Sequence, residues 1–389
     1  MVPGLRQPWL GLVATSATIA AAFLVIAPWP YATLAGIVAD VTMCAIPFTV
    51  VVAGLWQGRE PRPVALLGQP WRGLGLLGLA TVVAAVTWVV LSATFGGGRG
   101  DTPFLAFGII LSIVVTFWLD VVLGGWPFTQ VRNRFLGGVG LILAAYAITG
   151  LLLRGLDFSF FSGQPFYSGM DPSGPVPAWD GLVAAVTCLA TIFLFLHFEL
   201  WPLTRFPRIM RQPVLGVVWS VLLLAIGVPV YLVGTRVAGL SPDTFLVSVP
   251  VPFMFGTVVV LTMFKRSLTR RLRGRVRGLA SAVLAALVGV GLARLFLLLQ
   301  PTLTPDVPTA SPIDQHLWLA SALLAVTFPV MAMYHDLFGL WPIAAREDYA
   351  TGTTQDATES SSPAPSVATS RPSTAMKTAS TPDASDTLA

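Results

Sequence analysis

The sequence predicts an all-α polytopic membrane protein with about ten transmembrane helices. Of its 389 residues, 55% are hydrophobic and only 11% are charged, and the mean hydropathy is +0.77. Soluble domains carry about 25% charged residues. Apolar stretches of about 20 residues, the length that crosses the ~30 Å hydrocarbon core of a bilayer, recur along most of the chain. A lipid bilayer is therefore the expected surrounding of this protein.

Ten such stretches can be placed in order by their hydropathy. They lie near residues 9–29, 31–56, 73–95, 103–126, 136–153, 181–201, 214–234, 245–264, 278–299 and 316–341. We expect these boundaries to hold within about four residues. The loop at 154–180 is rich in aromatic residues and is expected to cap the bundle or lie in the headgroup layer. Residues 343–389 are rich in Ser, Thr and Pro, which predicts a disordered tail because little apolar surface is available for burial.

The basic residues predict the orientation, because Lys and Arg collect in loops that stay in the cytoplasm. All Lys and Arg residues except Arg99, Arg154, Arg236 and Arg294 fall on one side of the predicted spans. Both termini are therefore expected in the cytoplasm, with the chain in a plasma or inner membrane. The excess of Arg over Lys suggests a bacterial genome. The pI near 9.6 then reflects topology, and no nucleic-acid partner is expected, whereas the basic run 265–277 offers contacts to anionic lipid headgroups.

The odd-numbered spans begin in a related way, which predicts an internal repeat. A Gln-Pro pair followed one helical turn later by glycine starts at Gln7, Gln69 and Gln212. The period of roughly 60–70 residues predicts five tandem helical hairpins of parallel topology within one domain, 1–342. Their expected bounds are 7–57, 69–127, 132–202, 212–265 and 274–342. Prolines inside the even-numbered spans, at Pro47, Pro252 and Pro329, predict bends around a shared interior.

Three even-numbered spans carry ionisable residues just before a Trp-Pro pair, which we interpret as an interfacial anchor and helix stop. Charged groups inside a span are costly to bury, so they are candidates for function. These candidates are Asp120 before Trp126-Pro127, His197 and Glu199 before Trp201-Pro202, and His335 and Asp336 before Trp341-Pro342. At 1.5 Å per residue, Asp120 and His335 lie ~9 Å and His197 lies ~6 Å inside the tryptophan that follows.

Helical geometry limits which of these residues share a face. His197 and Glu199 are about 200° apart around the helix, so they cannot both face the interior. One of them is expected to face the interface or a basic loop residue. His335 and Asp336 are about 100° apart, so only one reaches a common interior fully. Asp40 lies near the middle of the second span, where a carboxylate is a candidate for proton or cation coupling.

Three functions fit these observations. The first is a permease for a small solute or ion, with Asp40, Asp120 and Glu199 in binding and coupling. The second is a membrane-embedded oxidoreductase component, because imidazole and carboxylate groups bind transition metals and two imidazoles can hold a haem iron. Its candidate ligands are His197, His335, Asp120 and Asp336. The third is a scaffold or accessory subunit, in which these side chains only snorkel or hydrogen-bond to neighbouring backbone.

Several catalytic signatures are absent from the sequence. It contains no Walker A sequence, Rossmann glycine motif, HExxH, GxSxG or CxxCH. ATP hydrolysis, zincin chemistry and covalent haem attachment therefore have no support from motifs. The sequence does not decide whether the protein is an enzyme.

Overall fold

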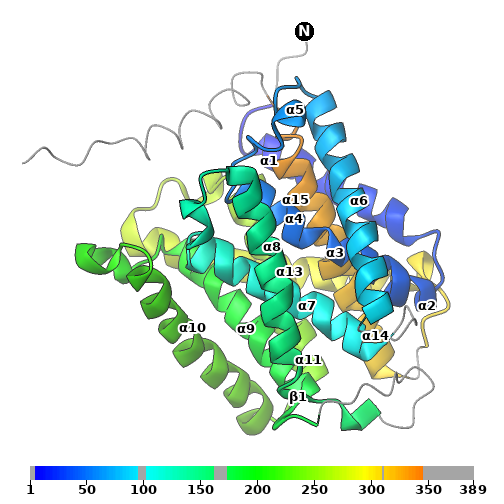
Figure 1. The fold of residues 1–389 in the computed structure, drawn as a ribbon. Helices are drawn as coiled ribbons and strands as arrows, with labels where there is room; N and C mark the ends of the chain where they lie inside the picture. The colour runs from blue at the N-terminus through cyan, green and yellow to red at the C-terminus, as the bar shows by residue number, and fades with distance from the viewer. Residues whose placement is uncertain (1–4, 95–101, 162–172, 309–310, 345–389) are drawn as a thin grey trace, which may run out of the picture. The chain divides into compact units, whose positions relative to one another are not determined.

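The structure, a computed structural model, describes residues 5–94, 102–161, 173–308 and 311–344. Within these residues, ten helical spans are long and apolar enough to cross a membrane. The predicted all-helical, ten-span membrane protein is therefore confirmed (Figure 1). We number the spans 1 to 10 in chain order.

The odd-numbered spans are almost continuous α-helices. Span 7 alone among the described odd-numbered spans ends in a π-helical turn, η7. The odd-numbered spans are α1 (Trp9–Ile26), α6 (Trp71–Thr94), α8 (Arg134–Leu153), α10 (Val214–Leu232) with η7 (Val233–Val237), and α13 (Gly274–Leu303).

The even-numbered spans are segmented, mostly by π-helical turns. Spans 2 and 4 are α2 (Tyr31–Thr33), η1 (Leu34–Val38), α3 (Ala39–Cys44) and α4 (Ile46–Ala53), and then α7 (Pro103–Phe117) and η2 (Trp118–Val122). Span 6 is the single helix α9 (Ala178–His197). Spans 8 and 10 are α11 (Pro242–Ser248), α12 (Pro250–Val258) and η8 (Val259–Met263), and then α14 (Pro312–Ala320), η10 (Ser321–Thr327) and α15 (Phe328–Asp336). Pro47 and Pro329 are the second residues of α4 and α15, so they stand at junctions between segments.

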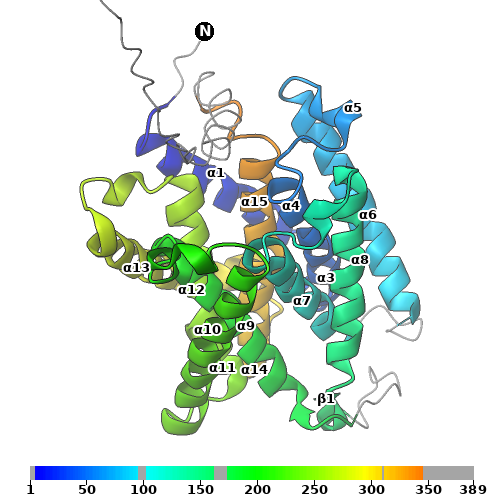
Figure 2. The same cartoon turned by 60° about the vertical axis from the view of Figure 1, so that its left-hand side comes forward.

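The even-numbered spans form a closed ring. Each contacts the next one in sequence, through α4 and α7, α7 and α9, α9 and α12, and α11 and α14, and the ring closes where α3 packs against η10 and α4 against α15. In the most apolar stretch of each span, 56–72% of the residues are buried in the even-numbered spans, against 17–44% in the odd-numbered ones. Figure 2 shows α4 and α15 lying between α1 and α6. The even-numbered spans are therefore the inner layer.

The odd-numbered spans pack outside this ring, each against at least two of its members. Helix α8 contacts α7 and α4, α10 contacts α9 and η2, and α13 contacts α12 and α9. Helix α1 contacts α15 and η8 in the same way. Helix α6 packs along α3 and α4 and reaches span 10 through Gln69. The outer layer thus covers the joints between neighbouring inner spans.

The Gln-Pro starts of three odd-numbered spans dock onto the ends of inner spans. In each case the glutamine amide donates a hydrogen bond to a backbone carbonyl at or just after the last turn of an even-numbered span. The bonds run from Gln7 to Met263 at 2.8 Å, from Gln69 to Leu337 at 2.8 Å, and from Gln212 to Val122 at 3.1 Å. The glycine one turn later permits this approach, since a side chain at Gly73 would collide with the ring of Phe338.

Each inner span ends in two consecutive residues with left-handed backbone. The pairs are Gln57-Gly58, Gly124-Gly125, Glu199-Leu200, Lys265-Arg266 and Gly339-Leu340. In all five the N–H of the second residue bonds back to a carbonyl in the last turns of the helix. The bond from Leu200 to Phe195 joins residues five apart, as in a Schellman motif, and the other four bonds join residues six apart. These four bonds run from Gly58 to Val52, Gly125 to Leu119, Arg266 to Val260 and Leu340 to Tyr334.

Because of these left-handed pairs, three inner spans end at earlier residues than the sequence predicts. The ends predicted at residues 126, 201 and 341 lie at Val122, His197 and Asp336 in the structure. The reason is that a left-handed pair stops an α-helix wherever it occurs, and the Trp-Pro pairs follow it in the connecting turn. The tryptophans therefore lie just beyond the helices.

The remaining described segments are short connections. Strand β1 (Leu156–Asp157) pairs in parallel with β2 (Val176–Pro177). Phe158, 1% exposed, packs edge-on against Phe104 and Phe107 at the start of span 4, so this part of the aromatic loop covers the helix end, while 162–172 lie outside the described residues. The other connections are α5 (Arg62–Ala65), η3 (Phe128–Gln130), η4 (Ser159–Phe161), η5 (Leu203–Arg205), η6 (Pro207–Ile209) and η9 (Ser267–Thr269). The predicted disordered tail lies outside the described residues from 345 onward.

Candidate functional site

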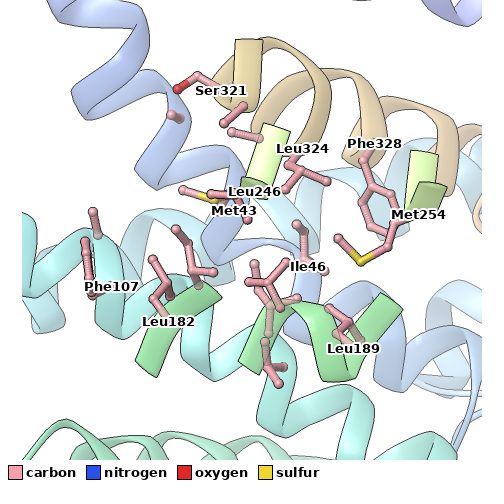
Figure 3. Close-up of a pocket in the computed structure, with 18 of the residues that line it drawn as sticks. Met43, Ile46, Phe107, Leu182, Leu189, Leu246, Met254, Ser321, Leu324 and Phe328 are labelled. Atoms are coloured by element: carbon pink, nitrogen blue, oxygen red, sulfur yellow. The ribbon is translucent and has the colours of Figure 1, made fainter. Parts of the chain in front are cut away.

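A cavity of about 160 Å³ lies within the ring of even-numbered spans. All five inner spans line it, and each lining residue belongs to one of them. Figure 3 shows Met43 from span 2, Phe107 from span 4, Leu189 from span 6, Met254 from span 8 and Phe328 from span 10 around this space. We call it the central cavity.

The lining of the central cavity is apolar and aromatic, with one ionisable group. Among the described lining residues, Asp40 alone has an ionisable side chain, and Ser321 alone has a hydroxyl group. Asp40 is 2% exposed. The aromatic side chains come from spans 4, 6 and 10, and they are Phe107, Phe117, Trp179, Phe193 and Phe328.

Two π-helical turns bring the polar groups to the central cavity. Asp40 is the second residue of α3, directly after η1, and Ser321 is the first residue of η10. Helix α3 and η10 are in contact where span 10 closes the ring against span 2. Because π-helical turns shift the register of the residues that follow them, they are frequent at functional sites.

Asp120 belongs to a separate cavity near the ends of spans 2 and 4. This cavity has a volume of about 340 Å³ and is lined by Gly54, Leu55, Gln57, Asp120, Gly124, Phe128, Thr129 and Arg134. Asp120 is 9% exposed, and its carboxylate accepts a hydrogen bond from the backbone N–H of Leu55. A side chain at Gly54 would occupy the position of this carboxylate. The structure therefore does not bring Asp120 and Asp40 into one cavity.

His197 and Glu199 face opposite ways, as their spacing predicts. His197 is 3% exposed, and its ring nitrogens bond to the hydroxyls of Ser281, at 2.8 Å, and Thr257, at 3.0 Å. These partners lie on spans 9 and 8, so the imidazole links three spans. Glu199 lies after the end of α9, with a side chain that is 54% exposed, and pairs with Arg266 and Arg277.

His335 and Asp336 contact each other near the end of α15. The His335 Nδ1 lies 2.6 Å from a carboxylate oxygen of Asp336, and both side chains are partly exposed, at 30% and 24%. Neither residue lines the central cavity or the Asp120 cavity. The ionisable residues that precede the Trp-Pro pairs are thus spread over several local environments.

The predicted metal or haem ligands are not gathered by these contacts. Within the part of the chain that the structure describes, no three His, Cys, Asp or Glu side chains lie close enough together to hold a metal ion. Both ring nitrogens of His197 already have hydroxyl partners. Metal binding stays a prediction, which metal analysis and a visible spectrum of the purified wild type against His197→Ala and His335→Ala would test.

Sequence reasoning did not find the aromatic lining or Ser321. Their signal is weak, because every face of an apolar span is apolar and nothing in one span marks the side that faces its neighbours. No family model, curated protein or solved structure matches the chain. The cavities and the residues around them are therefore the features of this protein that bear on its function.

Proposed function

We propose that this protein is a permease-like transporter that moves a small solute or ion through the central cavity. The observation that carries the proposal is the cavity itself, which is lined by all five inner spans and holds the buried carboxylate of Asp40. An ionisable residue deep inside a membrane protein commonly marks a substrate or ion pathway. In this proposal Asp40 contributes to binding of the solute or ion, or to coupling of its transport. The separate cavity around Asp120 is a second polar position for the solute or ion, on one side of the bundle.

The finer architecture in this proposal is five helical hairpins of parallel topology. Support comes from the equivalent docking of Gln7, Gln69 and Gln212 and from the left-handed pair that ends every inner span. We further propose that both termini are cytoplasmic in a plasma or inner membrane, because the basic residues cluster on the side where span 1 begins. Fusion of a reporter that is active only in the cytoplasm to either terminus tests this orientation.

Filling the central cavity should block transport. Ala325 lines the cavity and is 1% exposed, so Ala325→Phe places a ring in the pathway. The matched control is Ala147→Phe, because Ala147 is exposed on the outer helix α8. The purified variants and Asp40→Asn would be reconstituted into liposomes, and influx of choline, glycerol and acetate followed by light scattering after an osmotic step.

We expect at least one solute to enter wild-type and Ala147→Phe liposomes but not those with Ala325→Phe. Size-exclusion chromatography shows whether each variant is folded. A folded Ala325→Phe protein that transports like wild type would overturn the proposed pathway, and wild-type liposomes as impermeable as empty ones to every solute would overturn the transporter itself.

We also propose that the basic run 265–277 contacts anionic lipid headgroups. Two guanidinium groups lie over the ring of Trp201, Arg275 at 4.4 Å and Arg205 at 5.6 Å from its centroid. Arg266 and Arg277 share the carboxylate of Glu199, so positive charge dominates this surface. Phosphatidylglycerol should raise the melting temperature of the purified protein more than phosphatidylcholine does. Equal stabilisation by both lipids would count against this contact.

A further inference from the structure

We infer that the central cavity selects a small organic cation, with an ammonium group beside Asp40 and apolar substituents against the aromatic lining. This inference deepens the proposed function, on which it rests, because it names the class of substrate for the same cavity. Three properties of the central cavity support it: its charge, its aromatic side chains and its size.

The charge of the cavity favours a cation. Asp40 is 2% exposed, and among the described lining residues no Lys, Arg or His accompanies it. In a site that excludes water, the field of one carboxylate is screened far less than in solution. The described lining offers an anionic solute no positive side chain to bind, so anions are disfavoured.

The aromatic lining favours an organic cation over a metal ion. Phe107, Phe117, Trp179, Phe193 and Phe328 all line the cavity, and the faces of aromatic rings attract ammonium groups when water is excluded. A divalent metal ion needs about six oxygen ligands, several of them from the protein. The described lining supplies side-chain oxygens from Asp40 and Ser321 only. A quaternary ammonium group needs no such ligand set.

The size and polarity of the cavity argue against a sugar-like solute. The volume of about 160 Å³ suits a compact molecule. A polyol would lose its hydrogen bonds to water, and the described lining offers only Asp40, Ser321 and the indole N–H of Trp179 to replace them. Met43 and Met254 complete the lining, and flexible thioether side chains adapt to ligands of different shape.

Choline and its neutral isostere 3,3-dimethylbutan-1-ol separate charge from shape. Binding to the full-length protein in lipid nanodiscs would be measured by equilibrium dialysis of the radiolabelled compounds. We expect choline to bind on the order of 100-fold more tightly than the isostere, the range seen when one partner of a buried charge pair is removed. Equal affinities, or no binding of choline, would overturn the inference.

Variants test whether Asp40 causes the preference for choline over the isostere. Asp40→Asn should remove the difference between choline and the isostere, whereas Asp40→Glu should keep it. The matched control is Asp243→Asn, because Asp243 is a largely buried carboxylate on inner span 8 that pairs with His316 and does not line the central cavity. Trp179→Leu should reduce the affinity for choline more than that for the isostere. If Asp40→Asn is unfolded, the comparison of Asp40→Glu, Asp243→Asn and Trp179→Leu still decides the outcome, since a preference for choline that is unchanged in Trp179→Leu contradicts the inferred site.

Dialysis and liposome flux distinguish the two proposals. Choline binding that depends on Asp40, without flux of any solute, would contradict the proposed transporter and support the inferred binding site. Flux of glycerol or acetate that Ala325→Phe blocks, without a preference for choline, would support the transporter and contradict the inferred substrate class.

Discussion

The inner and outer helices of this protein obey different constraints. The odd-numbered spans face outward and are almost continuous α-helices, and one of them ends in a π-helical turn. Of the five inner spans, spans 2 and 10 are interrupted by π-helical turns and spans 4 and 8 end in one. In a bilayer, backbone groups exposed to lipid must be satisfied within the helix, so irregular backbone survives only where protein surrounds it. The interruptions that bring Asp40 and Ser321 to the central cavity are therefore tolerated because the outer layer shields them.

The largest expected effect tests how closely the two layers pack. Gly256 on the inner helix α12 lies directly against the backbone of Ala285 and Gly289 on the outer helix α13. Gly256→Val should destabilise the protein by about 3 kcal/mol or more, because neither backbone can move away easily. A Cβ atom at Gly291 on the same outer helix would meet no atom within 4 Å outside its own stretch of helix, so Gly291→Val is the control. Thermal unfolding in detergent measures both, and equal melting temperatures would refute this packing.

A smaller effect compares the two faces at the end of span 6. His197→Ala leaves the buried hydroxyls of Ser281 and Thr257 without their partner, which should cost about 2–3 kcal/mol. Glu199→Gln weakens an exposed pairing with Arg266 and Arg277 and should cost less than about 1 kcal/mol. If Glu199→Gln proved the more harmful of the two in thermal unfolding, our assignment of the buried and exposed faces would fail.

The smallest effect concerns the docking of outer spans by their Gln-Pro starts. Gln69→Leu removes the hydrogen bond from the side-chain amide to Leu337 and the one that Gly73 donates to the side-chain oxygen. We expect a loss of about 1–2 kcal/mol. Gln212→Leu removes the equivalent bonds at Val122 and Gly216, and the two losses should add because the sites share no partner. The exposed Gln130 provides the control Gln130→Leu, which should melt like wild type.

Part of the candidate site follows from local patterns. The spacing of His197 and Glu199 predicted that one of them would face the interface or a basic loop residue, and Glu199 pairs with Arg266 and Arg277. Asp40 stood out as a carboxylate near the middle of a span, and it lines the central cavity. The similar depth of Asp120 and His335 suggested a shared layer, but depth along a helix says nothing about direction around the bundle. Asp120 lines its own cavity, and His335 contacts Asp336.

The sequence by itself determined the number of spans, because hydropathy over about 20 residues depends only on local composition and the thickness of the bilayer. It also marked the bends through Pro47 and Pro329, since proline acts on its own backbone. Only the tertiary structure decided that the even-numbered spans close into a ring, that Asp40 faces its interior and that Trp179 and Phe193 face it too. In water an apolar stripe tells a helix which face to bury. In lipid both faces are apolar, so packing between spans makes that choice.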